Sequence, residues 1–351
     1  MIVLRSSIVI LFSLSISPIL AQNANEGFGF KEIPVSTTSA AMGGNQIAAY
    51  ATDVNQLTAN PAFFDSTLNQ SVSLSYLNYL TDINQTSLSY AHLTDSFGLI
   101  SGYFRYLDYG GFTESDEFGN ELGEFRSAEY ELGVSLTRAY SDRIYCGITL
   151  KQLYSNLYRS FAMGLAADFG AYYIDENGLQ MGLTLDNIGG RLVDYNRGGA
   201  SAFRPSLNFG ISKKFDKAPL MLSAQYNNLE TWDLAKTDAN SAALTTRDAL
   251  TGETERRVLT ADNLARHIAL SVAFVPSDKF NIVAGFDFRR RLELASAQRP
   301  GMVGFSLGTQ IKIKRFQLQY ALVSYNINGA SNHLALSTNL NNWYKRSSVT
   351  Q

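Results

Sequence analysis

The sequence predicts an all-β protein, an antiparallel β-barrel of the outer-membrane kind with about fourteen strands and an N-terminal plug segment. Three observations predict this fold class. Segments in which apolar and polar residues alternate follow one another along most of the chain. The connections between these segments are short and long in turn. After the start of the chain, no run of about 18 or more apolar residues occurs that would form a membrane-spanning helix.

The clearest two-sided segment is the predicted hairpin from Ser127 to Tyr154. In its first strand, one face carries Ala128, Tyr130, Leu132, Val134 and Leu136, and the other carries Ser127, Glu129, Glu131, Gly133, Ser135 and Thr137. In its second strand, Ile144, Cys146, Ile148 and Leu150 alternate with Tyr145, Gly147, Thr149 and Lys151. These strands approach the roughly 9 to 11 residues that cross a bilayer at a tilt, whereas strands of soluble sheets usually have about 5 to 6. We therefore expect a transmembrane hairpin.

The same alternation recurs in segments of roughly 10 to 12 residues, which is typical of a membrane barrel. It predicts strands near residues 70–79, 83–93, 97–107, 127–138, 144–154, 162–174, 179–188, 204–215, 219–229, 264–275, 280–290, 302–313, 316–326 and 332–343. Every second connection is short, and the others hold nearly all the length: 108–126, 189–203, 230–263 and 291–301. An even number of strands then places both chain ends at the short-turn rim, which faces the periplasm in such barrels.

The beginning of the chain predicts export. Arg5 precedes an apolar run that ends in small residues, so residues 1–21 predict a signal peptide cleaved after Ala21, with an uncleaved membrane anchor as the alternative. Residues 22–68 are rich in small residues, and Asn60-Pro61 is a turn signal, so we expect a plug rather than a periplasmic tail. Residues 69–345 then form the barrel, and residues 346–351 a C-terminal tail. The expected location is the outer membrane.

Composition excludes several classes of function. The net charge is -2, which does not suit a nucleic-acid binder or a protein held to lipid by a basic patch. Cys146 is the single cysteine, so we expect no internal disulfide bond. It lies on the apolar face of its strand, where a structural thiol is expected rather than a reactive one.

No pattern indicates catalysis, so we expect a non-enzymatic protein without catalytic, cofactor-binding or metal-binding residues. His92, His267 and His333 are far apart and lack the spacing of a metal site. One long connection is acidic, but its spacing matches no calcium loop and favours a solvated surface: Glu114, Asp116, Glu117, Glu121 and Glu124.

Several polar residues are expected to face the lumen. They either line a water-filled passage or pair with one another, and their mixed charges favour pairing: Glu129, Glu131, Lys151, Asp168, Asp186, Asp287, Arg289 and Gln310.

The chain resembles a known family over nearly all of its mature length. The plug stretch Thr38-Ser39-Ala40-Ala41-Met42-Gly43-Gly44, followed by Ala48, Asp53 and Asn60-Pro61-Ala62, resembles that of FadL-like barrels, especially their PorV/PorQ branch. The stretches 74–79, 106–114, 164–168 and 186–189 resemble PorQ-like proteins in particular. The resemblance implies a component of the type IX secretion system of Bacteroidota, acting with a surface attachment complex. It also gives the plug motif a structural role, with the residues Met42, Gly43, Gly44, Asp53, Asn60, Pro61 and Ala62.

Two functions are therefore expected. The first is a non-enzymatic component of protein secretion, a monomeric barrel within a larger complex that holds surface-exposed or secretion-system proteins. The second is a FadL-like channel that imports hydrophobic small molecules, with such a ligand in the lumen. The polar lumen weakens the second. For the first, the 230–263 connection is long enough to bind a partner, and its candidate contacts are Trp232, Leu234, Lys236, Arg247, Arg256 and Arg257.

Overall fold

The computed structural model describes residues 28–48, 53–195, 201–232, 234, 244–247, 254–257, 260–295, 301–327 and 329–344. The predicted signal peptide and the predicted tail after residue 345 lie outside these residues. Among the described residues, no helix is long and apolar enough to span a membrane.

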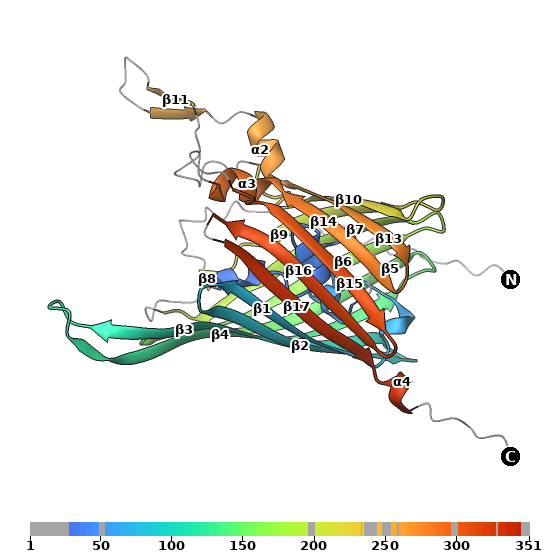
Figure 1. Cartoon of the computed structure of the whole chain (residues 1–351), viewed down its shortest axis with the longest axis horizontal. Helices are drawn as coiled ribbons and strands as arrows, with labels where there is room; N and C mark the ends of the chain where they lie inside the picture. The colour runs from blue at the N-terminus through green and yellow to red at the C-terminus, as the bar shows by residue number, and fades with distance from the viewer. Residues whose placement is uncertain are drawn as a thin grey trace, which may run out of the picture.

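A closed antiparallel sheet forms the wall of the molecule (Figure 1). The sheet has 15 strands, one of which, β8 (Ser201–Ala202), has two residues. The other fourteen close a barrel because β1 pairs with β17 and β6 pairs with β7. They are β1 (Ser71–Leu80), β2 (Ile83–Thr94), β3 (Gly98–Ser115), β4 (Glu121–Ala139), β5 (Ile144–Leu157), β6 (Ser160–Ile174), β7 (Leu179–Val193), β9 (Ser206–Lys214), β10 (Leu220–Tyr226), β13 (Ile268–Ser277), β14 (Phe280–Asp287), β15 (Phe305–Ile313), β16 (Phe316–Asn326) and β17 (Gly329–Asn339). The predicted fold class is confirmed.

The two faces of the wall have the predicted characters. On β4, Leu132 is 51% exposed on the outside, whereas the neighbouring Glu131 is 2% exposed on the inside. Val134 and Leu150 are likewise exposed, and Cys146 lies on this outer face. Because successive residues of a strand point to opposite sides, the outer surface is a band of aliphatic and aromatic side chains, as lipid contact requires.

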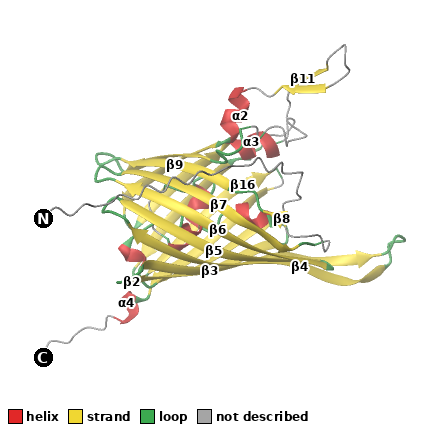
Figure 2. Cartoon of the chain, turned by 180° about the vertical axis from the view of Figure 1, so that it is seen from behind, coloured by secondary structure: helices red, strands yellow, loops and turns green. Residues whose placement is uncertain are grey.

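One predicted loop is wrong. The stretch from 108 to 126 was expected as a long connection, but β3 and β4 continue through most of it as a paired ribbon. Phe112 pairs with Phe125, and their rings stack 5.2 Å apart. At the tip, the Asp116 carboxylate accepts hydrogen bonds from Phe118 and Asn120, which closes a tight turn. The acidic residues suggested a solvated loop, but cross-strand pairing extends the hairpin beyond the barrel rim (Figure 2).

Three predicted strand ends are also corrected. The strand expected at 264–275 begins at Ile268, because α2 (Thr260–Arg266) precedes it. The strand expected at 280–290 ends at Asp287, whose side chain accepts the Arg290 N–H and starts α3 (Phe288–Leu294). The last strand ends at Asn339 and not near 343, and α4 (Asn341–Tyr344) follows. A separate two-strand ribbon, β11 (Leu244–Arg247) with β12 (Thr254–Arg257), lies within the longest connection.

Short helices fill part of the lumen (Figure 2). They are η1 (Gly29–Glu32), α1 (Thr37–Ala41), η2 (Val54–Thr58) and η3 (Ser66–Leu68). We call the described residues 28–48 and 53–70, which contain them, the plug. Ser36 caps α1 and Asp53 caps η2, each by accepting a backbone N–H. The helices are too short to be stable alone, so contacts with the wall must hold them.

Candidate functional site

The plug motif lies against the inner wall. Met42 and Ala62 are buried, and Gly43 has a positive φ of 93°, which a residue with a side chain rarely adopts. The side chain of Asn60 makes two hydrogen bonds within the plug. Its NH₂ group donates to the Ile47 carbonyl (2.8 Å), and its oxygen accepts the Ala62 N–H (2.9 Å). Met42 and Ala62 belong to different apolar clusters, so the motif residues contact the wall at separate places.

Asp53 of the plug motif is a buried carboxyl group. One of its oxygens accepts the Asn55 N–H (3.1 Å), and the other has no hydrogen-bond partner among the described residues. Burial raises the pKa of Asp53 to about 6.

Glycines on the wall allow the plug to approach closely. Six of them lie at inward positions opposite the plug backbone or its small side chains, and a Cβ atom at these sites would lie between 2.0 and 3.1 Å from the nearest plug atom. They are Gly147, Gly170, Gly182, Gly210, Gly285 and Gly308. Side chains at these positions would force the plug away from the wall.

Polar wall residues hold the plug backbone. Arg105 donates from Nη1 to the carbonyls of Phe30 and Ile33, at 3.0 Å each. The Gln225 side chain accepts the Ile47 N–H (3.2 Å), and the Ser306 hydroxyl donates to the Ala41 carbonyl (2.8 Å). These contacts supply hydrogen-bond partners to polar backbone groups of the plug.

Toward the short turns, the plug closes the lumen with apolar contacts. Phe63 and Leu57 pack in a buried cluster with Leu99 and Tyr172 of the wall, and the rings of Phe63 and Tyr172 lie 5.0 Å apart. We call this part of the lumen the sealed half.

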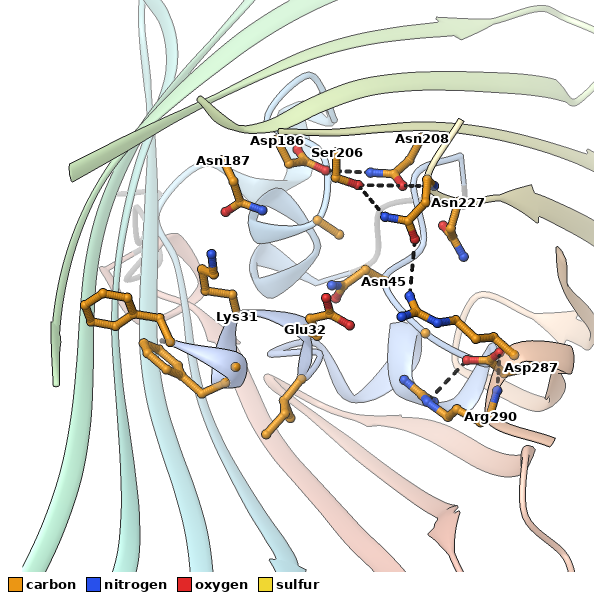
Figure 3. A pocket seen from close by; sticks show the side chains of 18 of the residues that line it. Lys31, Glu32, Asn45, Asp186, Asn187, Ser206, Asn208, Asn227, Asp287 and Arg290 are labelled. Carbon is orange, nitrogen blue, oxygen red and sulfur yellow. Dashed lines mark hydrogen bonds and ion pairs between the residues drawn. The ribbon is translucent and has the colours of Figure 1, made fainter. Parts of the chain in front are cut away.

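Toward the long loops, the lumen opens into a cavity of about 640 Å³ between the plug and the wall (Figure 3). Plug residues from Phe28 to Ile33 and from Gly43 to Asn45 form one part of its lining, and the ends of strands and α3 form the rest. Its size falls within the range of small-molecule sites, roughly 300 to 1,000 Å³. We call this part the open half.

One side of the cavity is acidic. Asp168 and Asp186 line it with Lys151, whose ammonium lies 2.7 Å from an Asp168 oxygen. Asp186 accepts hydrogen bonds from the Thr184 hydroxyl (2.9 Å) and the Asn208 amide (2.8 Å). Two carboxylates therefore face one ammonium group.

The opposite side carries arginines from the loop rim. Arg289 donates from Nε to both oxygens of Glu293 (3.1 and 3.2 Å) and from Nη1 to Asn228 (3.3 Å). Arg290 pairs with Asp287 (3.2 Å) and lies over the Tyr325 ring, 4.6 Å from its centroid. These guanidinium groups are fixed in place by their partners.

The predicted pairing of lumen charges with one another is observed for Lys151 and Asp168, and other members of the set pair with residues outside it. Lys151 pairs with Asp168, and Glu131 pairs with Arg105, both buried. The sequence analysis missed Arg105. Its position in the alternation of β3 places it on the inward face, so the pattern could have identified it. Glu129 accepts a hydrogen bond from Tyr109 (2.7 Å), and Gln310 accepts one from Gln319 (3.3 Å).

The candidate partner-binding residues are placed differently from one another. Trp232 is exposed, and its ring is stacked on that of the buried His267, with the centroids 6.2 Å apart. Leu234 is buried and lines the cavity, so it is not an exposed contact. Lys236 lies outside the described residues, and Arg247, Arg256 and Arg257 are described only as parts of β11 and β12. Partner binding by this loop stays a prediction.

Comparison with solved structures gives the class of protein that the fold defines. The toluene transporter TodX of P. putida matches with a TM-score of 0.52 and 12% identity, over 85% of this chain and 97% of TodX. The toluene transporter TbuX of Ralstonia pickettii matches with a TM-score of 0.50 and 14% identity, over 88% of this chain and 99% of TbuX. The chain is thus a closed barrel with the fold of outer-membrane transporters.

The likeness concerns the fold alone. It agrees with the outer-membrane barrel expected from the sequence and gives no support to the PorV/PorQ branch in particular. No protein-family model matches the chain, and no curated protein matches it.

Proposed function

We propose that the protein is an outer-membrane channel that admits small molecules, with the plug as its gate. The observation that carries this proposal is the division of the lumen into a sealed half and an open half with a cavity at the loop rim. A solute that enters from the long loops reaches this cavity first and is stopped by the plug.

The plug suits a gate because its described contacts with the wall are hydrogen bonds and packing. Such contacts can be exchanged for others when the plug shifts, at a cost of roughly 1 kcal/mol for each hydrogen bond lost. TodX and TbuX, which share the fold, are toluene transporters. Of the two functions expected from the sequence, the channel is therefore better supported than the secretion component.

The extended β3–β4 hairpin favours a second candidate, the attachment of a partner protein at the cell surface. Its distal part exposes Phe118 (88%) and Leu122 (63%) beyond the barrel rim. Exposed aromatic and aliphatic groups on a rigid ribbon are typical of protein contacts. Under this candidate, the partner contacts predicted from the sequence would take part as well: Trp232, Lys236, Arg247, Arg256 and Arg257.

A strain that lacks the protein separates the two candidates. We expect slower entry of at least one small solute from a labelled panel of peptides, sugars and aromatic hydrocarbons, with normal amounts of secreted protein at the cell surface. The wild-type gene should restore entry. Loss of surface-attached protein with unchanged entry of every solute would contradict the channel and favour the second candidate.

A further inference from the structure

The open half of the lumen holds two groups of opposite charge on different parts of the wall. The acidic group lies on β6 and β7, and the basic group lies on α3, after β14. Figure 3 shows Asp186 on one side of the pocket and Arg290 on the other. A ligand that fills the cavity therefore meets a carboxylate at one end and guanidinium groups at the other.

Asp186 is the acidic group that remains for a ligand. The described residues form no ion pair with it, because Lys151 is 2.7 Å from Asp168 instead. The Thr184 and Asn208 donors both bind its Oδ2, and no donor among the described residues binds Oδ1. A carboxylate held in this way by neutral groups has a free oxygen that can accept a hydrogen bond from a cation.

Arg289 is the matching basic group. Its hydrogen bonds among the described residues use Nε and Nη1, which leaves Nη2 for a ligand. Its side chain is 34% exposed. A guanidinium group held by a carboxylate on one edge presents its other edge in a fixed plane, and this geometry suits a second carboxylate.

Hydrogen bonds connect the two groups along the wall. Asn208, which donates to Asp186, accepts the backbone N–H of Asn228 at 3.0 Å. The Asn228 side chain in turn accepts a hydrogen bond from Arg289. The distance between the acidic and basic groups is thereby fixed before any ligand binds, which lowers the entropy cost of binding.

The separation of the groups selects the length of the ligand. Asp186 is on β7 and Arg289 follows β14, and the order β7-β9-β10-β13-β14 places four strand spacings between them. At about 4.8 Å per spacing this is roughly 19 Å between the two backbones. The Asp186 and Arg289 side chains together span roughly half of this, which leaves about 10 Å, or about three extended residues, for a ligand. A single amino acid is too short to contact both groups, whereas an extended peptide gains about 3.3 Å per residue.

Amide side chains lie between the two groups. Asn45 of the plug and Asn227 of the wall line the cavity there, as Figure 3 shows. Amides both donate and accept, so they match the N–H and C=O groups of a peptide backbone. A hydrocarbon at this place would remove charged and amide groups from water without replacing their hydrogen bonds, which is unfavourable.

We propose that the cavity binds a short peptide of about three residues with free ends, its ammonium group at Asp186 and its carboxylate at Arg289 and Arg290. This inference rests on the proposed channel and specifies its substrate class. Binding needs both charged ends and enough length to span them.

Trialanine and three derivatives test the proposal on the full-length barrel in detergent, by calorimetry. We expect trialanine to bind, and N-acetyl-trialanine, trialanine amide and free alanine each to bind at least about tenfold more weakly. Equal affinity for trialanine and both blocked peptides would overturn the proposal, and so would binding of toluene with no binding of trialanine.

Two variants assign the ends. Asp186→Asn should weaken trialanine binding by about tenfold and leave the affinity for N-acetyl-trialanine unchanged. Arg289→Gln should also weaken trialanine binding by about tenfold and leave the affinity for trialanine amide unchanged. Glu176→Gln, in an exposed turn at the other rim, is the matched control. Heat-modifiable migration of each variant shows that the barrel is folded. If either charge variant is folded and binds trialanine as tightly as the wild type, the assigned end is wrong.

Transport is measured separately, in liposomes that contain the barrel. Binding of trialanine without entry of any solute would support the peptide site and contradict the channel. Entry of other solutes without binding of trialanine would support the channel and overturn the peptide site.

Discussion

The two halves of the lumen are built from the same strands but differ in what faces inward. In the sealed half, inward residues include glycines such as Gly147 and apolar side chains such as Leu99, and the plug packs on them directly. In the open half, charged and amide side chains join apolar ones such as Leu107, and a cavity of about 640 Å³ remains. Removal of side chains brings the plug to the wall, whereas long charged side chains keep the space open.

This difference separates two tasks. Close packing without voids stops diffusion through the sealed half and needs no charged group. Charged groups in the open half can recognise a ligand because they are held in place by partners, as Arg289 is by Glu293. Changes in the sealed half should therefore affect leakage, and changes in the open half should affect selectivity.

The largest effect is expected where the two halves meet. Arg105→Met removes the buried partner of Glu131 and two hydrogen bonds to the plug. Loss of one partner of a buried ion pair costs about 3 to 5 kcal/mol, so the folded fraction in urea should fall strongly. Arg143→Met, which breaks an exposed pair with Glu176, should cost about 1 kcal/mol or less. Similar losses in both variants would show that the Arg105 contacts do not stabilise the fold.

A smaller effect is expected from a single methyl group in the sealed half. In Gly147→Ala the new Cβ would lie 2.0 Å from the Pro61 carbonyl oxygen, so the plug must shift, at a cost of about 1 to 3 kcal/mol. Conductance in planar bilayers should rise. Gly102→Ala is the control, because its Cβ would meet only the Gly133 carbonyl oxygen at 3.8 Å. Unchanged conductance in folded Gly147→Ala would contradict the sealing role of this contact.

The smallest effect is expected from Asp53 and depends on pH. Burial raises its pKa from 3.8 to about 6, so between these values the folded state holds a proton that the unfolded state releases. Stability should therefore fall as pH rises from about 4 to 6. Asp53→Asn should flatten this part of the profile of folded fraction against pH. An identical slope in wild type and variant would show that Asp53 does not cause the fall in stability between about pH 4 and 6.

The sequence predicted the wall better than the lumen. Alternation along Ser127 to Tyr154 fixes which side chains face out, because a strand has a period of two. The extension of β3 and β4 was missed because acidic residues and glycines suggest a loop, whereas pairing of Phe112 with Phe125 depends on two distant segments. The cavity was also missed. Its charged groups come from strands and helices far apart in the sequence, and no local pattern shows that Asp186 and Arg289 line one space.

The central claim is that the plug must move for a solute to pass, and a reversible tether tests it most directly. Ala48 of the plug lies against Gly210 of β9, where an added Cβ would be 3.1 Å from the Ala48 Cβ, close to disulfide geometry. The variant Ala48→Cys/Gly210→Cys, with Cys146→Ser to remove the native thiol, is placed in liposomes. The probe is trialanine or toluene, whichever the wild type admits. We expect entry to stop when the cysteines are oxidised and to return when they are reduced. Equal entry in the oxidised and reduced states would contradict the account.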